Sequence, residues 1–312
     1  MKHRYLPEGM LISDYENEEY LRTRAGLERA LERQKILEAV AFLCDSDFCL
    51  HFRLGELKGI MPRQEVALTQ GDEPVKDIAI LTRVGKPVCF KVLGFRRDGE
   101  GEPVAILSRR AAQEECRLYY IDTLSPGDVI PAVITHLECF GAFTDVGCGI
   151  VSLLSIDCIS VSRISHPRAR LSPGDRISVI VKSIDGAGRI FVSQRELLGT
   201  WEENAALFSA GQTVAGIVRS IESYGAFIEL TPNLAGLAEP KEGLAVGRSA
   251  AVYIKSIIPE KMKVKLIVID TNGPESEKKP PRYFTDPRQV SHISHWRYSP
   301  PQCPRIIETC FL

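Results

Sequence analysis

Two pairs of aromatic side chains with the same spacing are the residues of this sequence best suited to hold a ligand. Phe140 and Phe143 flank a Gly-Ala dipeptide, and Tyr224 and Phe227 flank another. Residues three apart point to opposite faces of a regular strand, whereas a glycine-centred turn or bulge brings both rings to one face. Rings exposed on one face stack on nucleic-acid bases, whatever the base. The alternative is that one ring of each pair belongs to a core, and the spacing leaves both interpretations open.

Basic side chains near these pairs are the second ingredient of a surface that binds a phosphate backbone. Lys182 and Lys255 occupy matched positions in two similar segments, and Lys261, Lys263 and Lys265 alternate along one predicted strand, which puts them on one face. The other candidates are Arg189, on a predicted turn, and Arg219, on a predicted strand. For any one of them, a purely solvated side chain is the alternative.

An internal repeat contains both aromatic pairs and shows which elements position them. The segment 125–143 aligns without a gap with 209–227 at an offset of 84 residues, and 174–184 aligns with 247–257 at an offset of 73. The first copy is therefore 11 residues longer (84 − 73), and we expect a longer loop between Gly149 and Gly174. A repeat of this size indicates a duplicated small domain.

Each copy contains about five short alternating runs separated by glycine turns, a pattern typical of a small closed barrel. In the first clear copy the runs are 129–137, 142–146, 149–153, 176–184 and 189–193. Residues 35–112 form a third, diverged copy without the aromatic-Gly-Ala-Phe motif, and Phe48 and His51 are its nearest substitutes. We expect a structural or protein-docking role for that copy.

The remaining segments are predicted to be helical or extended. Leucines at helical spacing indicate a helix over 14–34, with Ser13 as the N-cap and Glu16 three residues later. Residues 194–207 read as a helical linker, and the segment 271–312 is rich in proline and charge. The predicted domains are 1–34, a helical segment; 35–115, a degenerate barrel; 121–195, a barrel; 196–208, a linker helix; 209–270, a barrel; and 271–312, a Pro-rich extension.

The order of these motifs resembles the S1 RNA-binding domain, the OB-fold module repeated in bacterial ribosomal protein S1. The resemblance rests on Gly127-Asp128, the motif 140–143, Gly149-Ile150-Val151, Gly174-Asp175 and the run 181–185, and it extends to 209–270 and weakly to 35–112. It implies an all-β fold with linker helices, built of tandem five-stranded OB-fold barrels of which the first is degenerate.

The same resemblance implies that one face of each barrel binds single-stranded RNA. It maps the stacking residues onto the two aromatic pairs and a surface basic residue onto Arg189, which follows Asp185. Where the family often has a histidine, the second barrel has Ser152 or Ser155 and the third has Glu239. Because a carboxylate repels phosphate, we expect the second barrel to bind RNA more strongly than the third. The predicted RNA-binding residues are Phe140, Phe143, Ser152, Lys182, Arg189, Arg219, Tyr224, Phe227, Lys255 and Lys263.

The bulk composition restricts the other classes of function. A net charge of −1 excludes a generally basic nucleic-acid coat, so a binding site has to be local. No Walker loop, GxSxG or HExxH motif is present, and we expect neither an enzyme nor a cofactor. The sequence shows no signal peptide or membrane span, which favours the cytoplasm, and its nine cysteines are expected to be free thiols. His292, His295, Cys303 and Cys310 are zinc-competent but irregularly spaced, so we predict no metal site.

Two hypotheses follow. The first is an S1-type protein that binds single-stranded RNA, messenger or ribosomal, in translation or RNA metabolism, with the small ribosomal subunit as a further partner and no membrane. The second is a scaffold of degenerate barrels, associated with a ribosome or a ribonuclease, that has little affinity for RNA.

Overall fold

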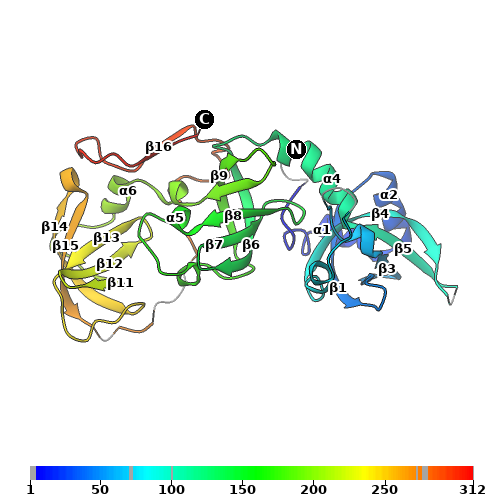
Figure 1. Cartoon of the computed structure of the whole chain (residues 1–312), viewed down its shortest axis with the longest axis horizontal. Coiled ribbons are helices and arrows are strands. Elements are labelled where there is room, and N and C mark those ends of the chain that lie inside the picture. Colours follow the sequence, from blue (N-terminus) through cyan, green and yellow to red (C-terminus); the bar gives the residue numbers. More distant parts are fainter. Residues whose placement is uncertain (1–4, 70–72, 100, 272, 276–279, 312) are drawn as a thin grey trace. The chain divides into compact units, whose positions relative to one another are not determined.

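The computed structural model contains three closed five-stranded barrels (Figure 1) and describes residues 5–69, 73–99, 101–271, 273–275 and 280–311. Barrel one consists of β1 (Leu37–Cys44), β2 (Leu50–Leu54), β3 (Leu57–Met61), β4 (Pro87–Arg97) and β5 (Pro103–Ser108). Barrel two consists of β6 (Val129–Glu138), β7 (Gly141–Asp145), β8 (Val151–Ser155), β9 (Arg176–Ile184) and β10 (Ile190–Ser193). Barrel three consists of β11 (Thr213–Glu222), β12 (Gly225–Thr231), β13 (Leu234–Ala238), β14 (Ser249–Ile258) and β15 (Lys263–Asp270).

All three barrels share one topology. In each, the first three strands are neighbours in chain order, the fifth strand lies beside the third, and the fourth closes the barrel. The third and fifth strands pair in parallel in every copy, as β3 with β5, β8 with β10 and β13 with β15. This is the five-stranded Greek-key barrel called the OB fold. The predicted fold class is thereby confirmed, and β6–β10 coincide with the five predicted runs, their ends shifted by no more than two residues.

The chain divides into two compact units. The first comprises Met1–Leu124 with Pro131–Val133 and Asp145–Val151, and the second comprises the rest. Some residues of the predicted segments lie outside the described part of the chain. They are 1–4 of the N-terminal segment, 70–72 and 100 of the first barrel, and 272, 276–279 and 312 of the Pro-rich extension.

Two short helices cover barrel one where a single helix was predicted. They are α1 (Tyr15–Arg22) and α2 (Arg24–Glu32). The predicted N-cap was one residue early, because Asp14, not Ser13, accepts from the Asn17 amide. Thr23 has extended backbone and caps the second helix, which explains the break. Both helices bury side chains in the core of barrel one, including Tyr20, Leu27 and Ala30.

A buried cluster of charges joins the N-terminal segment to the rest of the first unit. The Glu8 carboxylate receives two hydrogen bonds from Arg109, at 2.6 and 3.0 Å, and lies 3.4 Å from Arg83. Arg109 begins α4 (Arg109–Tyr119), and its side chain is 7% exposed. Asp145 accepts from the amides of Glu8, Gly147 and Gly149. The segment before α1 is therefore held by a hydrogen-bonded ion pair.

Two buried carboxyl groups are expected to make the stability of the first unit depend on pH. Burial raises the pKa of Glu38 to about 7, and burial together with the neighbouring Glu8 carboxylate raises the pKa of Asp145 to about 7. The folded state thus retains protons that the unfolded chain releases near its ordinary carboxyl pKa. The stability that these groups contribute is complete below that ordinary pKa and is lost as the pH rises through about 7.

We therefore expect the urea midpoint of the first unit to fall between about pH 5.5 and pH 8. The measurement is circular dichroism during urea unfolding at a series of pH values. The Glu38 carboxyl accepts from the Leu11 amide, and glutamine at this position cannot ionise. Glu38→Gln should therefore make the urea midpoint depend less on pH. A midpoint that rises with pH over this interval would contradict the assignment.

The remaining helices are short. Besides α3 (Asp77–Leu81) and α4, they are α5 (Ile156–Ile159), α6 (Trp201–Ala205) and the 3₁₀ turns Arg63–Glu65, Ile121–Thr123, Pro167–Ala169, Arg195–Leu198 and Pro259–Lys261. The predicted linker helix over 194–207 is divided at Gly199, which has a φ of +84°, and Thr200 then forms a capping box with Glu203. All nine cysteines are free, as predicted.

The longer loop predicted in the first clear copy is confirmed, and it ties barrel two to barrel three. The amide of Val161 donates to the side chain of Asn233 at 3.0 Å, and that of Ser162 donates to the Pro232 carbonyl at 3.1 Å. From the same loop, Arg170 forms two hydrogen bonds to Glu229 of β12, at 2.9 and 2.6 Å. The loop therefore connects barrels two and three by hydrogen bonds and an ion pair inside the second unit.

The C-terminal segment packs back onto the second unit through Trp296 and Tyr298. It pairs β16 (His295–Arg297) with β17 (Glu308–Cys310). Trp296 and Tyr298 are 7% and 5% exposed and belong to the core of barrel three, together with Trp201. His292 lies 3.1 Å from the Asp128 carboxylate of barrel two and is exposed.

Candidate nucleic-acid interface

The two aromatic rings of each pair meet edge to face. The centroids of Phe140 and Phe143 are 6.0 Å apart at an interplanar angle of 89°, and those of Tyr224 and Phe227 are 6.2 Å apart at 87°. Phe140 is 51% exposed and Tyr224 is 66% exposed, so the first ring of each pair is not a core residue. His136 of β6, which the sequence interpretation missed, lies 6.4 Å from Phe143 with the rings nearly parallel. Its position one strand away gave no sequence signal.

The glycine between the rings permits a close approach of two strands. A Cβ at Gly141 would lie 2.5 Å from the Leu154 carbonyl oxygen, and one at Gly225 would lie 2.6 Å from that of Ala238. Real Cβ atoms do not approach so closely, so any larger residue would push β7 from β8, or β12 from β13. The motif thus places a ring before and a ring within the second strand, beside the third strand.

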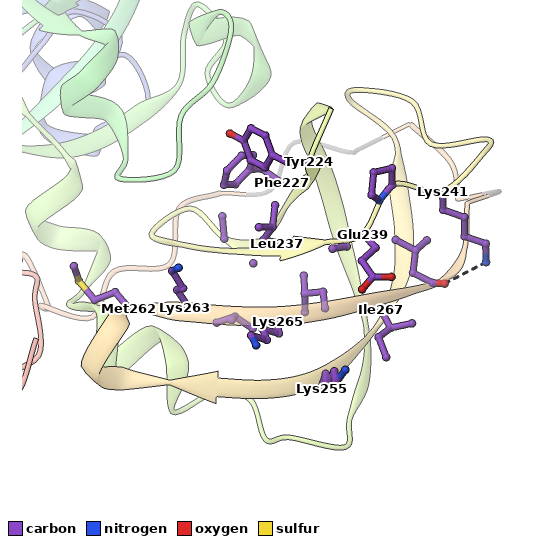
Figure 2. Close-up of a pocket in the computed structure, with 17 residues that line it drawn as sticks. Tyr224, Phe227, Leu237, Glu239, Lys241, Lys255, Met262, Lys263, Lys265 and Ile267 are labelled. Carbon is purple, nitrogen blue, oxygen red and sulfur yellow. Dashed lines mark hydrogen bonds between the residues drawn. The ribbon is translucent and has the colours of Figure 1, made fainter. Parts of the chain in front are cut away.

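A groove of about 800 Å³ opens over β13 and β15 of barrel three (Figure 2). Tyr224 and Phe227 stand on one side of it, and Leu237, which is 38% exposed, lies between them and β15. Four lysines and one glutamate line the groove: Lys241, Lys255, Lys263, Lys265 and Glu239. A cationic groove beside stacking rings is the arrangement that single-stranded nucleic acids require.

The strand β15 presents its lysines as the alternation predicted, with one exception. Lys263 and Lys265 are exposed on one face of β15, and Lys265 lies opposite Leu237 of β13. Lys261 lies in the preceding 3₁₀ turn and not on the strand. The ammonium group of Lys241 donates to the carbonyls of Val268 and Ile269, at 3.1 and 2.8 Å, at one end of the groove.

In barrel two the predicted basic residues are fewer and partly engaged. Arg189 is 74% exposed and forms an ion pair with Asp185 at 2.7 Å. Hydrogen bonds from the Arg189 amide and guanidinium lower the pKa of Asp185. Lys182 is half-buried, with its ammonium group 3.1 Å from the Cys158 sulfur. Lys255, its counterpart in barrel three, is exposed and lines the groove.

Two other predicted residues face inward. Ser152 is 3% exposed, and its hydroxyl donates to the Ile190 carbonyl at 2.8 Å. Arg219 is 11% exposed in its side chain and donates to Glu229 at 2.8 and 3.0 Å, beside Arg170. Both side chains are engaged in these internal hydrogen bonds, so we leave both out of the interface proposed below.

Barrel one has its own cation–aromatic contacts at the corresponding turn. His51 pairs with Leu43 across β1 and β2, as Phe227 pairs with Ser220 in barrel three, so the predicted substitute does occupy the equivalent position. The Arg53 guanidinium lies 4.6 Å from the centroid of Phe42, and that of Arg63 lies 4.8 Å from Phe48. Arg63 thus lies against Phe48, the substitute for the first ring of the pair, whereas Phe42 on β1 is 43% exposed.

The tail residues with metal-ligand chemistry separate into different places. His295 and Cys310 come together with Glu308 on β16 and β17, their ligand atoms within 4.8 Å of one another and all exposed. Cys303 is buried, and His292 contacts Asp128. The four residues considered for zinc therefore do not converge.

The three barrels with their repeated topology define a tandem OB-fold protein. Residues 123–195, which contain barrel two, match the model of the S1 RNA binding domain family. The chain therefore carries an S1 domain, and the resemblance read from its motifs is confirmed. In the part of the chain that the structure describes, no helix has both the length and the apolar character that a membrane crossing demands.

Curated relatives carry the name of a ribosomal protein. The chain is 32% identical over 178 residues to small ribosomal subunit protein bS1 of Leuconostoc lactis, covering 52% of this chain and 41% of the relative. It is 27% identical over 225 residues to the protein of that name from Rhizobium meliloti, covering 66% of this chain and 38% of the relative. The chain thus spans less than half the length of each.

Among solved structures, a multidomain protein with nucleic acid binding domains from Streptococcus pneumoniae is similar at 14% identity. The match covers 75% of this chain and 73% of that one, with a TM-score of 0.25. So low a score does not indicate a shared arrangement of the barrels.

Proposed function

We propose that the protein binds single-stranded RNA through the aromatic faces of barrels two and three. The observation that carries this proposal is the groove of barrel three, in which Tyr224 and Phe227 stand opposite lysines of β15. The rings offer stacking to any base, and the lysines neutralise successive phosphates. Barrel two contributes Phe140, Phe143 and His136 with Arg189, so each barrel holds part of one strand.

The domain boundaries predicted above belong to the same proposal, with barrel one and its helices as a structural or protein-docking module. The relatives named small ribosomal subunit protein bS1 support a role in translation, in the cytoplasm and with the small ribosomal subunit as a partner. We propose no catalytic role, since the groove presents stacking rings and cations and no paired acid, base or nucleophile.

Replacing Tyr224 and Phe227 by alanine should each weaken RNA binding by about 1–3 kcal/mol, because each change removes a stacking surface. The measurement is fluorescence anisotropy of a labelled single-stranded RNA, titrated with the full chain over a series of salt concentrations and compared with the duplex. Lys265→Ala should reduce the slope of log affinity against log salt by about 0.7, the value for one phosphate contact on a single strand.

A matched control separates stacking from folding. Tyr15 on α1 is 80% exposed and far in sequence from the groove, and its replacement by alanine should leave binding unchanged. Trp201 in the core of barrel three reports by its fluorescence whether each variant is folded. If the wild-type chain binds no RNA at low salt, the scaffold hypothesis replaces this one.

A further inference from the structure

The groove of barrel three contains one carboxylate among four ammonium groups. Glu239 follows β13 directly, is exposed, and lines the groove with Tyr224 and Phe227. Figure 2 shows its carboxylate directed toward β15, inside the groove. Pro240 follows it, and a residue before proline is restricted to extended backbone, which limits the directions that the side chain can take.

The lysines do not neutralise this carboxylate. Among the described residues, no lysine of the groove forms an ion pair with Glu239, and Lys241 donates to the Val268 and Ile269 carbonyls. Glu239 is thus an acceptor-only group at the side of a stacking platform. A phosphate is repelled there, so a ligand atom that contacts it has to be a hydrogen-bond donor.

The bases differ in the donors that they present to a carboxylate. Guanine has two adjacent donors on its Watson–Crick edge, at N1 and N2, which match the two oxygens of a carboxylate. Adenine and cytosine each present one amino group there, beside an acceptor nitrogen. Uracil presents N3–H between two carbonyl oxygens, which a carboxylate repels. A carboxylate within reach of a stacked base therefore selects guanine.

We infer that Glu239 makes barrel three a guanine-selective subsite, with the base stacked on Tyr224 and Phe227 and its N1–H and N2–H donating to the carboxylate. This inference rests on the RNA binding proposed above and adds a sequence preference to it. The lysines of β15 keep the phosphate contacts proposed above. The negative charge in the groove thus selects the base, and the positive charges bind phosphates.

Barrel two provides an internal comparison. Because β13 and β8 pair in the same register with β15 and β10, Leu237 corresponds to Leu153, and Glu239 corresponds to Ser155. A serine both donates and accepts, so it does not discriminate between bases by charge. The subsite of barrel two is therefore tolerant of sequence, and the guanine preference belongs to barrel three alone.

The test compares single-stranded heptamers of uridine that carry at the central position uridine, adenosine, inosine or guanosine. The protein is the full chain with Phe140→Ala and Phe143→Ala, so that binding reports barrel three. We expect guanosine to bind about tenfold more tightly than uridine or adenosine, within the discrimination that a bidentate contact provides. Inosine keeps N1–H and lacks the N2 amino group, so it should lie between them.

The variant Glu239→Gln, added to the same background, tests whether the Glu239 carboxylate selects guanine. It should bind the uridine heptamer as tightly as its parent or more tightly, because a negative charge is gone, and its preference for guanosine should disappear. Salt-sensitive binding of all heptamers with equal affinity would overturn the inference and leave RNA binding intact. A guanosine preference that survives Glu239→Gln would also overturn it, whereas failure of every heptamer to bind would remove the proposed function as well.

Discussion

Replacing Arg109 by methionine should destabilise the first unit by about 3–5 kcal/mol, the usual cost of removing one partner of a buried ion pair. Arg109 and Glu8 are 7% and 8% exposed in their side chains, and Arg109 also donates to the Val66 carbonyl at 3.2 Å. Without Arg109 the buried Glu8 carboxylate keeps only the more distant Arg83 and the Cys89 amide. Because the charge of Glu8 cannot return to water without unfolding the segment, the penalty is large.

The two tryptophans allow the unfolding of the second unit to be followed separately from that of the first. Trp201 and Trp296 both lie in the core of barrel three, so their fluorescence follows the second unit. We expect Arg109→Met to lower the urea midpoint of the first unit, measured by circular dichroism, and to leave the midpoint measured by tryptophan fluorescence unchanged. Arg24→Met, at an exposed ion pair with Glu28, is the control and should cost no more than about 0.5 kcal/mol.

A double replacement separates a missing charge partner from a missing side chain. Glu8→Leu combined with Arg109→Met removes both charges and should recover much of the stability, because a buried pair is often replaced by apolar residues at little cost. A double variant as unstable as Arg109→Met would show that packing, and not the unpaired carboxylate, dominates at this position.

Replacing Trp296 by alanine should destabilise barrel three by about 3–5 kcal/mol, the range for large aromatic side chains removed from a core. Its ring packs 5.7 Å from that of Tyr298, whose hydroxyl donates to the Asn233 carbonyl. Tyr298 in turn accepts from the Trp201 amide at 3.0 Å. The C-terminal segment therefore completes a core that residues 209–270 do not fill alone.

The matched control is Trp296→Phe. The indole nitrogen of Trp296 is buried and has no hydrogen-bond partner in the described structure, so phenylalanine forfeits area and no hydrogen bond. We expect it to cost much less than alanine, with Trp201 fluorescence during urea unfolding as the measurement for both variants. Equal midpoints for wild type and Trp296→Ala would mean that the tail is dispensable for barrel three.

The sequence predicted the barrels and the paired rings because both depend on local order. Alternation of apolar residues and glycine turns located β6–β10, and the repeat supplied the same elements for barrel three. In barrel one the match was weaker, since Phe48 and His51 stand where the other copies have the aromatic motif. The motif requires glycine because the neighbouring strand approaches so closely that no Cβ fits at Gly141 or Gly225.

Only the tertiary structure decided which charged side chains stay exposed and which are engaged in buried ion pairs. Arg219 looked available for phosphate, yet it pairs with Glu229 and shares that carboxylate with Arg170, which is 59 residues from Glu229 in the chain. In barrel three, lysines from β14 and β15 converge on a groove beside the rings, although they are apart in the sequence. The stronger RNA binding expected of barrel two stays a prediction. Burial and ion pairing depend on partners that are distant in sequence. A pattern of residue types therefore determines the strands, and the contacts between strands determine which charges remain free to bind.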